Sequence, residues 1–594
     1  MTHPTSARLT FERPSEARFC LQGPMRQRLE ANLEQWLLVA PQANPAMLEI
    51  FRDRDRKPRR DLVPWAGEFA GKYLTSAVLH YRLTRDGRLR VQIDRFVDEL
   101  IGVQAEDGYL GPFPTSERLT GTESSGRGKL WDLWGHYHCM LGLYLWYKEA
   151  DYAPAMATCI KAADYICGRL QGGAERVRDA GAEEMNMAIA HIMAILYQET
   201  GEERYLKMVR EVEADFQVPP SGDYIRTALR GIPYWQTPKP RWESLHAIQA
   251  ILCLYQITGD EDYRKAFEHI WRSIRATDVH NTGGFTSAEQ AVGNPYDPRA
   301  IETCCTVAWM VLSVDMLRLS GDPYVADTLE LATYNGALGA MAPSGRWWTY
   351  DTPMDGVRKA SAHHIVFQAR EGSPELNCCS VNAPRSLGLI SDWAIMHSAD
   401  GLVVNYYGPG ATTIDLPQGP RVQLVQETGY PMDGRIQLYV NPDRPATFSL
   451  RLRVPGWSTR TGATLNGDAL APVAGQYLVI AREWRNGDVV TLDLNMALHT
   501  WIGEREAEGK VSLYRGPLLL AWDRRFNVMD PDDVPAVDLA DLEAKRLAWS
   551  GAFPEPWLLL SLPTADGREL VLCDFATAGM SGTPYISWLP CKGD

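Results

Sequence analysis

The sequence contains no run that would carry the chain into a membrane or onto nucleic acid. Its first residues lack the basic start and apolar stretch of a signal peptide. No uncharged apolar stretch approaches the roughly 20 residues of a membrane span. No lysine- or arginine-rich run stands out, and the formal net charge is -14 at pH 7. We therefore expect a cytoplasmic protein with no nucleic-acid or membrane partner; a mature form that has lost its leader stays open.

A disulfide framework is also missing. The chain has eleven cysteines, and an odd number spread over 594 residues is not the pattern of a small disulfide-rich domain. Hydrophobic residues make up 45% and charged residues 23% of the chain, as in ordinary globular proteins. Because 594 residues exceed what one hydrophobic core can serve, we expect two to four domains.

A recurring phrase in the first two-thirds of the chain predicts paired helices. An apolar helix end is followed by a Gly/Asp/Glu turn and then by a tyrosine that opens the next helix, at 196–205 and 254–263 and, more weakly, at 147–152 and 319–324. Glycine favours the left-handed position after a helix, and the acidic residue can cap the next one. The tyrosines lie roughly 50 to 60 residues apart, room for two helices each. A closed (α/α)-type barrel of helical hairpins, or an open solenoid, would bury their apolar faces.

After about residue 400 the pattern changes to short alternating strands separated by Pro, Gly and Asn/Asp. The predicted strands are 401–407, 435–440 and 447–454, and then 511–514, 557–562 and 569–573. Such spacing is typical of antiparallel sandwiches. We expect an α+β multidomain protein with a helical domain at 1–390, a β-sandwich at 391–500 and a second, smaller β domain at 501–594.

Two short cysteine-containing segments carry the predicted chemistry. Glu302 and Cys304 lie two residues apart, and Cys378 and Cys379 are adjacent. Zinc favours thiolates and accepts a carboxylate oxygen as fourth ligand, so a fold that joins the two segments would form a zinc site. Three other interpretations remain at this stage: small buried apolar residues, a disulfide between the segments, or a structural metal without chemistry.

The residues around these cysteines resemble glycoside hydrolase family 127, whose best-known members are β-L-arabinofuranosidases. The similar motifs, spread over nearly the whole chain, are Gly67–Tyr73, Gln104–Gly111, Glu302–Cys304, Tyr334–Gly336, Cys378–Asn382, Tyr430–Gly434, Arg453–Trp457 and Tyr514–Leu518. The resemblance implies an (α/α)6 barrel followed by β-sandwiches, in agreement with the pattern above.

The resemblance also implies roles for individual residues. A zinc ion would be held by Glu302, Cys304, Cys378 and Cys379, with Cys378 as the nucleophile. Glu289 would be the acid/base, although its loop is shorter than usual in the family and a solvated loop glutamate is the alternative. Cys305 stands where the family commonly has a small residue, and we interpret it as packing.

Five further residues are predicted to contact the sugar: His138, His246, Tyr350, Gln104 and Asn186. Without the resemblance, the two histidines would be read as hydrogen-bonded core residues and Tyr350 as aromatic packing.

The resemblance therefore implies a retaining hydrolase that removes non-reducing-end β-L-arabinofuranosides, or a similar sugar, through a zinc-bound thiolate. Two alternatives stay open. One is another (α/α)-barrel enzyme, such as a polysaccharide lyase, an uronyl hydrolase or a sugar epimerase, which fold alone does not separate. The other is a non-catalytic carbohydrate-binding protein with structural zinc. A carbohydrate is the expected partner, and a homodimer is left open.

Overall fold

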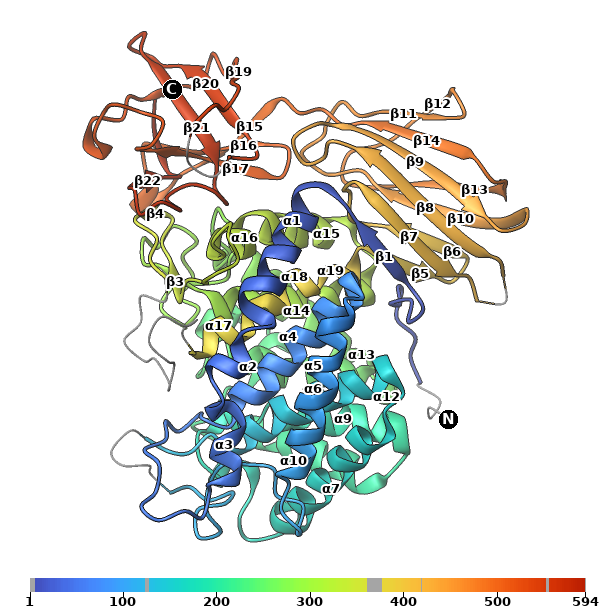
Figure 1. Cartoon of the computed structure of the whole chain (residues 1–594), viewed down its shortest axis with the longest axis vertical. Helices are drawn as coiled ribbons and strands as arrows, with labels where there is room; N and C mark the ends of the chain where they lie inside the picture. Colours follow the sequence, from blue (N-terminus) through green and yellow to red (C-terminus); the bar gives the residue numbers. More distant parts are fainter. Residues whose placement is uncertain (1–5, 123–127, 361–375, 418, 552–554, 593–594) are drawn as a thin grey trace.

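The computed structural model describes residues 6–122, 128–360, 376–417, 419–551 and 555–592. A helical domain occupies the lower part of the molecule, and two β units lie above it, one on each side (Figure 1). The α-helices run to Trp393, and the strands of the two β units begin in the chain at Ile395, apart from β1 and β4. Helices followed by β-sheets are the arrangement that the sequence predicts.

The helical domain is built from antiparallel pairs. The helices of the inner layer contact one another in order, and the last two return to the first: α4 Glu68–Thr84, α6 Asp132–Ala150, α9 Ile189–Thr200, α12 Ser244–Thr258, α14 Thr303–Ser320, α17 Cys378–Asn382 and α18 Pro384–Gly388. The helices outside them are α5 Gly87–Gly102, α7 Ala153–Leu170, α10 Glu203–Phe216, α13 Glu261–Thr277 and α15 Pro323–Leu331. Shorter helices are α1 Gly23–Asn32, α2 Ala40–Ala43, α3 Ala46–Arg52, α8 Glu183–Asn186, α11 Tyr224–Leu229, α16 Leu338–Ala340 and α19 Ile390–Trp393.

The turns between paired helices have the conformation that the repeated phrase predicts. Gly201, Gly259 and Gly321 follow α9, α12 and α14 with φ of 73°, 72° and 64°, the left-handed region in which glycine has no steric cost. The side chains of Asp260 and Asp322 then accept hydrogen bonds from backbone N–H groups at the starts of α13 and α15. The repeat is therefore a hairpin signal with a local physical cause.

The inner helices are apolar on nearly all sides because other helices cover them. Of the described helices, α14 is long and apolar enough to cross a membrane, but 83% of its span is buried inside the protein. A core helix of a large domain has this character.

The first β unit is a pair of facing sheets. One sheet has the order β1 Arg18–Leu21, β7 Gly410–Asp415, β8 Arg421–Thr428, β9 Arg435–Pro442, β14 Asp488–Asp493, β11 Gly462–Leu465 and β12 Asp468–Leu470. The other has the order β13 Tyr477–Trp484, β10 Ala446–Arg453, β6 Gly401–Val404 and β5 Ile395–Ser398. Along β9 every second residue is buried, the alternation expected of a strand with one face on a core.

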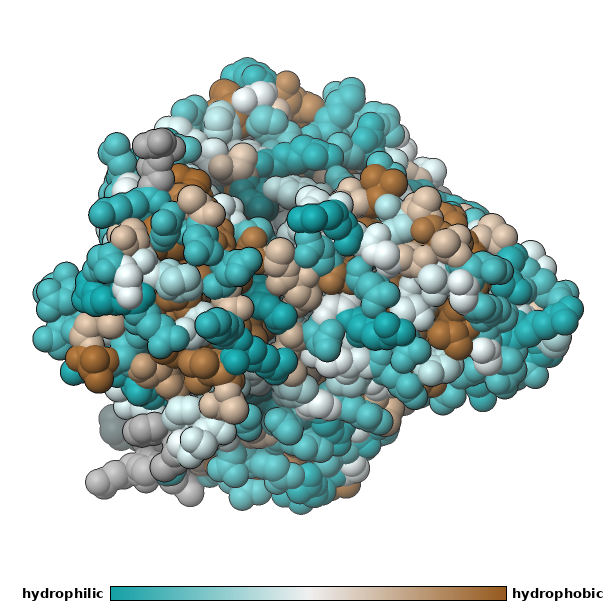
Figure 2. Space-filling view, turned by 90° about the horizontal axis from the view of Figure 1, so that it is seen from above, coloured by the Kyte–Doolittle hydropathy of each residue, from teal (hydrophilic) through white to brown (hydrophobic). Residues whose placement is uncertain are grey.

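The second β unit is one larger sheet near the C-terminus. Its path is β18 Val537–Asp538, β23 Leu589–Lys592, β16 Lys510–Arg515, β17 Leu518–Asp523, β21 Glu569–Asp574, β20 Leu559–Pro563 and β19 Lys545–Arg546, with β15 Leu498–Ile502, β22 Tyr585–Ile586 and β4 Asp355–Gly356 paired beside it. From the end that carries the sheets, the surface is mainly hydrophilic, and its hydrophobic residues form separate groups (Figure 2).

Two strands cross the boundaries that the sequence predicts. β1, from the N-terminal segment, pairs antiparallel with β7 and extends the first β unit. β4, from the helical range, pairs with β22 of the C-terminal sheet. Both strands form hydrogen bonds with backbone groups at a sheet edge that would otherwise lack partners. Because the paired segments are far apart in the sequence, no local sequence pattern predicts these pairings.

The helical domain and the first β unit are joined by buried charges. The Arg453 guanidinium of β10 lies 2.5 Å from Asp327 and 2.6 Å from Glu330, both on α15. The hydroxyl of Tyr430 donates to Glu330 at 2.6 Å. Because Arg453 and Glu330 are almost fully buried, the charge of each is stabilised by the opposite charge of the other, and removing either would leave an unpaired buried charge.

Candidate active site

The structure brings the two cysteine segments together. One donor atom from each of Glu302, Cys304, Cys378 and Cys379 lies within 4.8 Å of all the others. The Cys379 Sγ is 3.5 Å from the Cys304 Sγ, 3.9 Å from the Cys378 Sγ and 3.4 Å from Glu302 Oε1. Three of these residues are buried, and Cys378 is half-buried. All eleven cysteines are free thiols, so the disulfide interpretation is wrong.

Local structure explains how each ligand is presented. Glu302 ends the short strand β2, Ile301–Glu302, which pairs with β3, Asp351–Thr352, and α14 begins at the next residue. Cys304 therefore lies in the first turn of α14, where the positive end of the helix dipole favours a thiolate. On the other segment, the Asn377 side chain accepts the Ser380 N–H at 2.9 Å and starts α17 at Cys378.

The donor set fits zinc in both chemistry and spacing. Tetrahedral zinc with Zn–S bonds of about 2.3 Å separates two sulfur ligands by about 3.8 Å, and a sulfur from an oxygen ligand by about 3.5 Å. The Cys379 contacts of 3.5, 3.9 and 3.4 Å match these edges. Three thiols and a carboxylate are, moreover, the donors that zinc prefers over magnesium or calcium.

The electrostatics of the cluster favour a cation. Burial raises the pKa of Cys304, but hydrogen bonds with Cys378 and Cys379 and the nearby Lys72 outweigh it and lower that pKa to about 6. A hydrogen bond with Cys304 then raises the pKa of Cys378 to about 12. Burial and the neighbouring Cys378 raise the pKa of the Glu302 carboxyl. Without a cation, these crowded acids cannot all lose their protons, whereas a bound divalent ion would deprotonate the thiols.

A buried cation and a tyrosine border the cluster. Lys72 of α4 is fully buried and pairs with Glu68 at 2.9 Å. Burial lowers the pKa of Lys72, but Cys304 and Glu68 reverse the effect, so the net shift is upward and the ammonium keeps its charge. The Tyr350 hydroxyl lies 3.5 Å from the Cys378 Sγ, and burial raises the pKa of that phenol. Tyr350, predicted to lie near the sugar, is thus a neighbour of the predicted nucleophile.

The two predicted histidines lie together among buried aromatic rings. The His138 ring stands edge-on to Trp134 at 4.4 Å and lies 5.5 Å from the His246 ring. Both ring nitrogens of His138 and the Nε2 of His246 have no hydrogen-bond partner among the described residues. Burial lowers the pKa of both imidazoles, which keeps them neutral. Neutral rings with free donors and acceptors can bind sugar hydroxyls, which a satisfied core histidine could not do.

Glu289 lies on a strained loop beside the cluster. Its φ is 67°, and the preceding Ala288 has φ of 52°, values uncommon for side-chain-bearing residues and often found at functional sites. Its carboxylate pairs with Arg241 at 2.8 Å, and it is 37% exposed, so a ligand can reach it. Burial and the charge of Glu289 raise the pKa of Asp351 to about 6. The charge of Glu289 also contributes, after burial and Cys378, to the raised pKa of Glu302, so Glu289 lies near the cluster.

The amide groups of the two remaining predicted contacts are engaged by the backbone. Gln104 donates to the carbonyls of Gly108 and Thr158, both at 3.0 Å. Asn186 accepts the Trp134 N–H at 3.2 Å and donates to two backbone carbonyls. In this structure both side chains hold loops and helix starts in place, and their contact with a sugar stays a prediction.

Several site residues escaped the sequence argument as individual candidates. Glu68 and Lys72, four apart at the start of α4, lie within the motif Gly67–Tyr73 and could have been found as an (i, i+4) acid–base pair. The Lys72 ammonium also lies over the rings of Trp134 and Trp242, at 5.5 and 5.2 Å. Glu243, two residues after Arg241, is buried, which raises its pKa to about 7. Nothing in its local sequence distinguishes it.

Comparison with known proteins gives a consistent result. Residues 21–391 match the family described as "Beta-L-arabinofuranosidase, GH127 catalytic domain", and residues 401–496 match "Beta-L-arabinofuranosidase, GH127 middle domain". The chain is 26% identical over 586 residues to a non-reducing end β-L-arabinofuranosidase of Bifidobacterium longum subsp. longum, covering 87% of this chain and 86% of that protein.

Solved structures agree on the fold. The structure of a GH127 β-L-arabinofuranosidase from Geobacillus stearothermophilus T6 superposes with a TM-score of 0.80 at 20% identity, over 97% of this chain and all of that one. A second GH127 β-arabinofuranosidase gives a TM-score of 0.80 at 21% identity, over 98% of both chains. The match to the catalytic domain spans more than half of the sequence, so the protein is a glycoside hydrolase and belongs to family 127.

Proposed function

We propose that this protein is a retaining β-L-arabinofuranosidase that releases L-arabinofuranose from the non-reducing ends of β-linked chains. The curated relative named above carries this activity, and its similarity extends over most of both chains. The observation that carries the proposal is the convergence of Glu302, Cys304, Cys378 and Cys379 within 4.8 Å. We also infer that the closed cycle of inner helices is the (α/α)6 barrel of the family.

The residues present would hold one zinc ion through three sulfurs and one carboxylate oxygen. When bound, the zinc supplies positive charge that keeps its cysteine ligands as thiolates at neutral pH. Cys378 is the ligand most suited to attack a substrate, because it is half-buried whereas Cys304 and Cys379 are fully buried. Asn382 donates to the Cys304 Sγ at 3.5 Å, which supports that ligand from behind.

The proposed reaction has two displacements. The Cys378 sulfur attacks the anomeric carbon, the glycosidic C–O bond breaks, and Glu289 gives its proton to the departing oxygen. In the second step Glu289 removes a proton from water, and the resulting hydroxide displaces the sulfur from the anomeric carbon. Two inversions give net retention, as in retaining glycosidases that use two carboxylates.

The other site residues would position the sugar. His138 and His246 present unpaired ring nitrogens to the pocket, so each can accept from or donate to a hydroxyl group. Trp134 and Trp242 line the same region and can pack on the apolar face of a sugar ring. Arg241, which pairs with both Glu243 and Glu289, would hold the acid/base carboxyl in place.

A reducing compartment such as the cytoplasm fits the eleven free thiols, three of which the proposed reaction needs unoxidised. A purely structural role for the zinc, without sulfur chemistry, differs in its requirement for Cys378: it predicts that Cys378→Ser leaves hydrolysis intact.

The test is a comparison of p-nitrophenyl glycosides under reducing conditions. We expect release of p-nitrophenol from the β-L-arabinofuranoside and little from the α-L-arabinofuranoside or from arabinopyranosides. NMR of the first-formed product should show the β-anomer. Cleavage restricted to a pyranoside would overturn the substrate, and an inverted first product would overturn the covalent step.

A further inference from the structure

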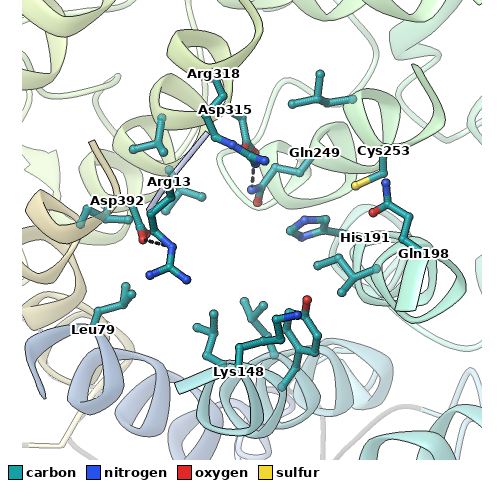
Figure 3. Close-up of a pocket in the computed structure, with 18 of the residues that line it drawn as sticks. Arg13, Leu79, Lys148, His191, Gln198, Gln249, Cys253, Asp315, Arg318 and Asp392 are labelled. Carbon is teal, nitrogen blue, oxygen red and sulfur yellow. Dashed lines mark hydrogen bonds and ion pairs between the residues drawn. The ribbon is translucent and has the colours of Figure 1, made fainter. Parts of the chain in front are cut away.

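The helical domain contains a second cavity at the end away from the cysteine cluster. The cluster, Lys72 and the two paired histidines lie at the start or in the first halves of α4, α6, α12 and α14 and on α17, whereas this cavity is lined mainly by residues of the later turns of α4, α6, α12 and α14 and by residues along α9. Its volume is about 360 Å³, within the range of small-molecule sites. Figure 3 shows charged and amide side chains from several helices around an open centre.

Most charged groups that line the cavity are already paired. Arg82 lies 3.0 Å from Asp392, Lys148 lies 3.0 Å from Glu199, and Arg318 lies 2.9 Å from Glu12 and 3.3 Å from Asp315. The lining contains five basic and four acidic residues. Every acidic residue of the lining therefore takes part in an ion pair, whereas one positive charge of the lining takes part in none among the described residues.

Arg385 of α18 carries that charge. It is only 5% exposed, and it lines the cavity. Its Nε and Nη1 have no hydrogen-bond partner in the described part of the chain, and no ion pair joins it to those residues. A guanidinium cannot lose its charge near neutral pH, and burying it unpaired is costly, so it requires an anion.

Arg13 points its guanidinium into the same space. Its Nε lies 3.4 Å from Asp392, and Figure 3 shows the terminal nitrogens directed toward the cavity centre. His191 and Gln249 reach the cavity from α9 and α12; the Gln249 amide donates to Asp315 at 2.8 Å, and the His191 Nδ1 contacts the Tyr137 hydroxyl, which leaves the His191 Nε2 as a neutral group for a ligand. Two guanidinium groups with neutral donors beside them are a common arrangement for binding a carboxylate or phosphate group.

We propose that this cavity binds a small organic anion through its oxyanion group, with Arg385 and Arg13 as the charged contacts. Arg385 supplies the buried, uncompensated charge, and Arg13 closes the site from the N-terminal segment. The remaining volume accommodates the organic part of the ligand against Leu79, Leu141 and Ile195. This site is separate from the sugar pocket and does not depend on the proposed glycosidase activity.

The test is isothermal titration of the full-length protein with sodium phosphate and, separately, with sodium succinate, at constant ionic strength set by sodium chloride. We expect saturable binding of one anion per chain, and the stronger of the two titrations identifies whether the site prefers phosphate or carboxylate. Arg385→Gln and Arg13→Gln should each weaken that binding by about tenfold or more, the loss of a charge-assisted contact.

The matched control is Arg421→Gln, which removes an exposed arginine of β8 that pairs with Asp415 far from the cavity. It should bind as the wild type does. Absence of saturable binding of both anions would overturn the proposal, and so would equal binding by the Arg13→Gln variant. Should Arg385→Gln fail to fold, Arg13→Gln decides alone, because Arg13 is partly exposed and its removal leaves no buried group unpaired. An anion bound at the cysteine cluster would be insensitive to Arg13.

Discussion

The two ends of the helical domain differ in the sign of the charge that their buried groups require. At one end, three thiols and the Glu302 carboxyl are crowded together and need a cation before they can all ionise. At the other end, Arg385 is buried without an ion pair to any of the residues that the structure describes. The comparison indicates that one helical domain can bury uncompensated charge of opposite sign at its two ends. Because such charge is costly to bury, each end favours a ligand of the opposite charge.

One hydrogen-bonded path joins the two ends. The Tyr137 hydroxyl lies 3.0 Å from the Nδ1 of His246, a proposed sugar contact, and 3.1 Å from the Nδ1 of His191, which lines the cavity at the other end. Tyr137 lies on α6, and each histidine on another inner helix. The two regions are therefore chemically distinct but physically connected.

The largest expected effect is at the sulfur end. Cys378→Ala removes the proposed nucleophile and should lower kcat by about 10³-fold or more on an aryl β-L-arabinofuranoside. Cys305→Ala is the matched control, because this buried thiol lies 3.8 Å from the Glu302 carboxylate without belonging to the donor set. It should retain most activity. Equal losses in both variants would mean that packing, not sulfur chemistry, accounts for the effect.

Glu289→Gln should lower kcat by about 10² to 10⁴-fold, the usual contribution of a general acid/base. The rate of the first step should fall less for a substrate with a p-nitrophenol leaving group than for one with an alkyl alcohol, because a good leaving group needs little protonation. Stopped assays on both substrate types measure this difference. If the loss does not depend on the leaving group, Glu289 is not the acid. Glu243→Gln removes another carboxylate that pairs with Arg241, at 2.7 Å, and so tests whether loss of an ion pair to this arginine is enough to explain the change in kcat.

Acid should destabilise the helical domain. Burial lowers the pKa of His80 to about 4, of His191 to about 3 and of His280 to about 4. In the unfolded chain these histidines titrate near 6.5, so below that pH the unfolded state binds more protons and the free energy of unfolding falls. Each contributes about 1.4 kcal/mol per pH unit between pH 6.5 and its folded pKa.

Urea unfolding midpoints at pH 7, 6 and 5 measure this slope. His80→Leu should flatten it, because that histidine is fully buried and burial lowers its folded pKa to about 4. Comparing variant with wild type separates the histidine contribution from loss of metal, which both proteins share. An unchanged slope in the variant would refute the assignment.

The smallest expected effect concerns the path between the ends. Tyr137→Phe removes the hydroxyl that contacts both histidines and should raise KM or lower kcat by about threefold to tenfold, the value of one or two neutral hydrogen bonds. His191→Gln changes only the histidine that lines the cavity away from the cysteine cluster, so it should have a smaller effect on kcat and KM in the same assay. A larger loss in His191→Gln than in Tyr137→Phe would contradict a path that runs through the hydroxyl.

Local signals predicted much of the architecture and the core of the site. The glycine and aspartate turns, such as Gly259–Asp260, act within a few residues and predicted where helices end and begin. Glu302 and Cys304 were recognisable because zinc chemistry restricts its donors to few residue types. What remained hidden depends on distant segments meeting: β1 beside β7, Lys72 against the cluster, and the absence of an ion pair for Arg385 within the described part of the chain. Arginine in a sequence is usually paired or exposed, and only the closed fold shows otherwise.

X-ray absorption at the zinc edge tests the central claim most directly. The account predicts one zinc per wild-type chain with three sulfur neighbours at about 2.3 Å and one lighter atom at about 2.0–2.2 Å. In Cys378→Ala the count should fall to two sulfurs. A protein that binds no zinc, or a sulfur count unchanged by this substitution, would contradict the metal-held thiolate.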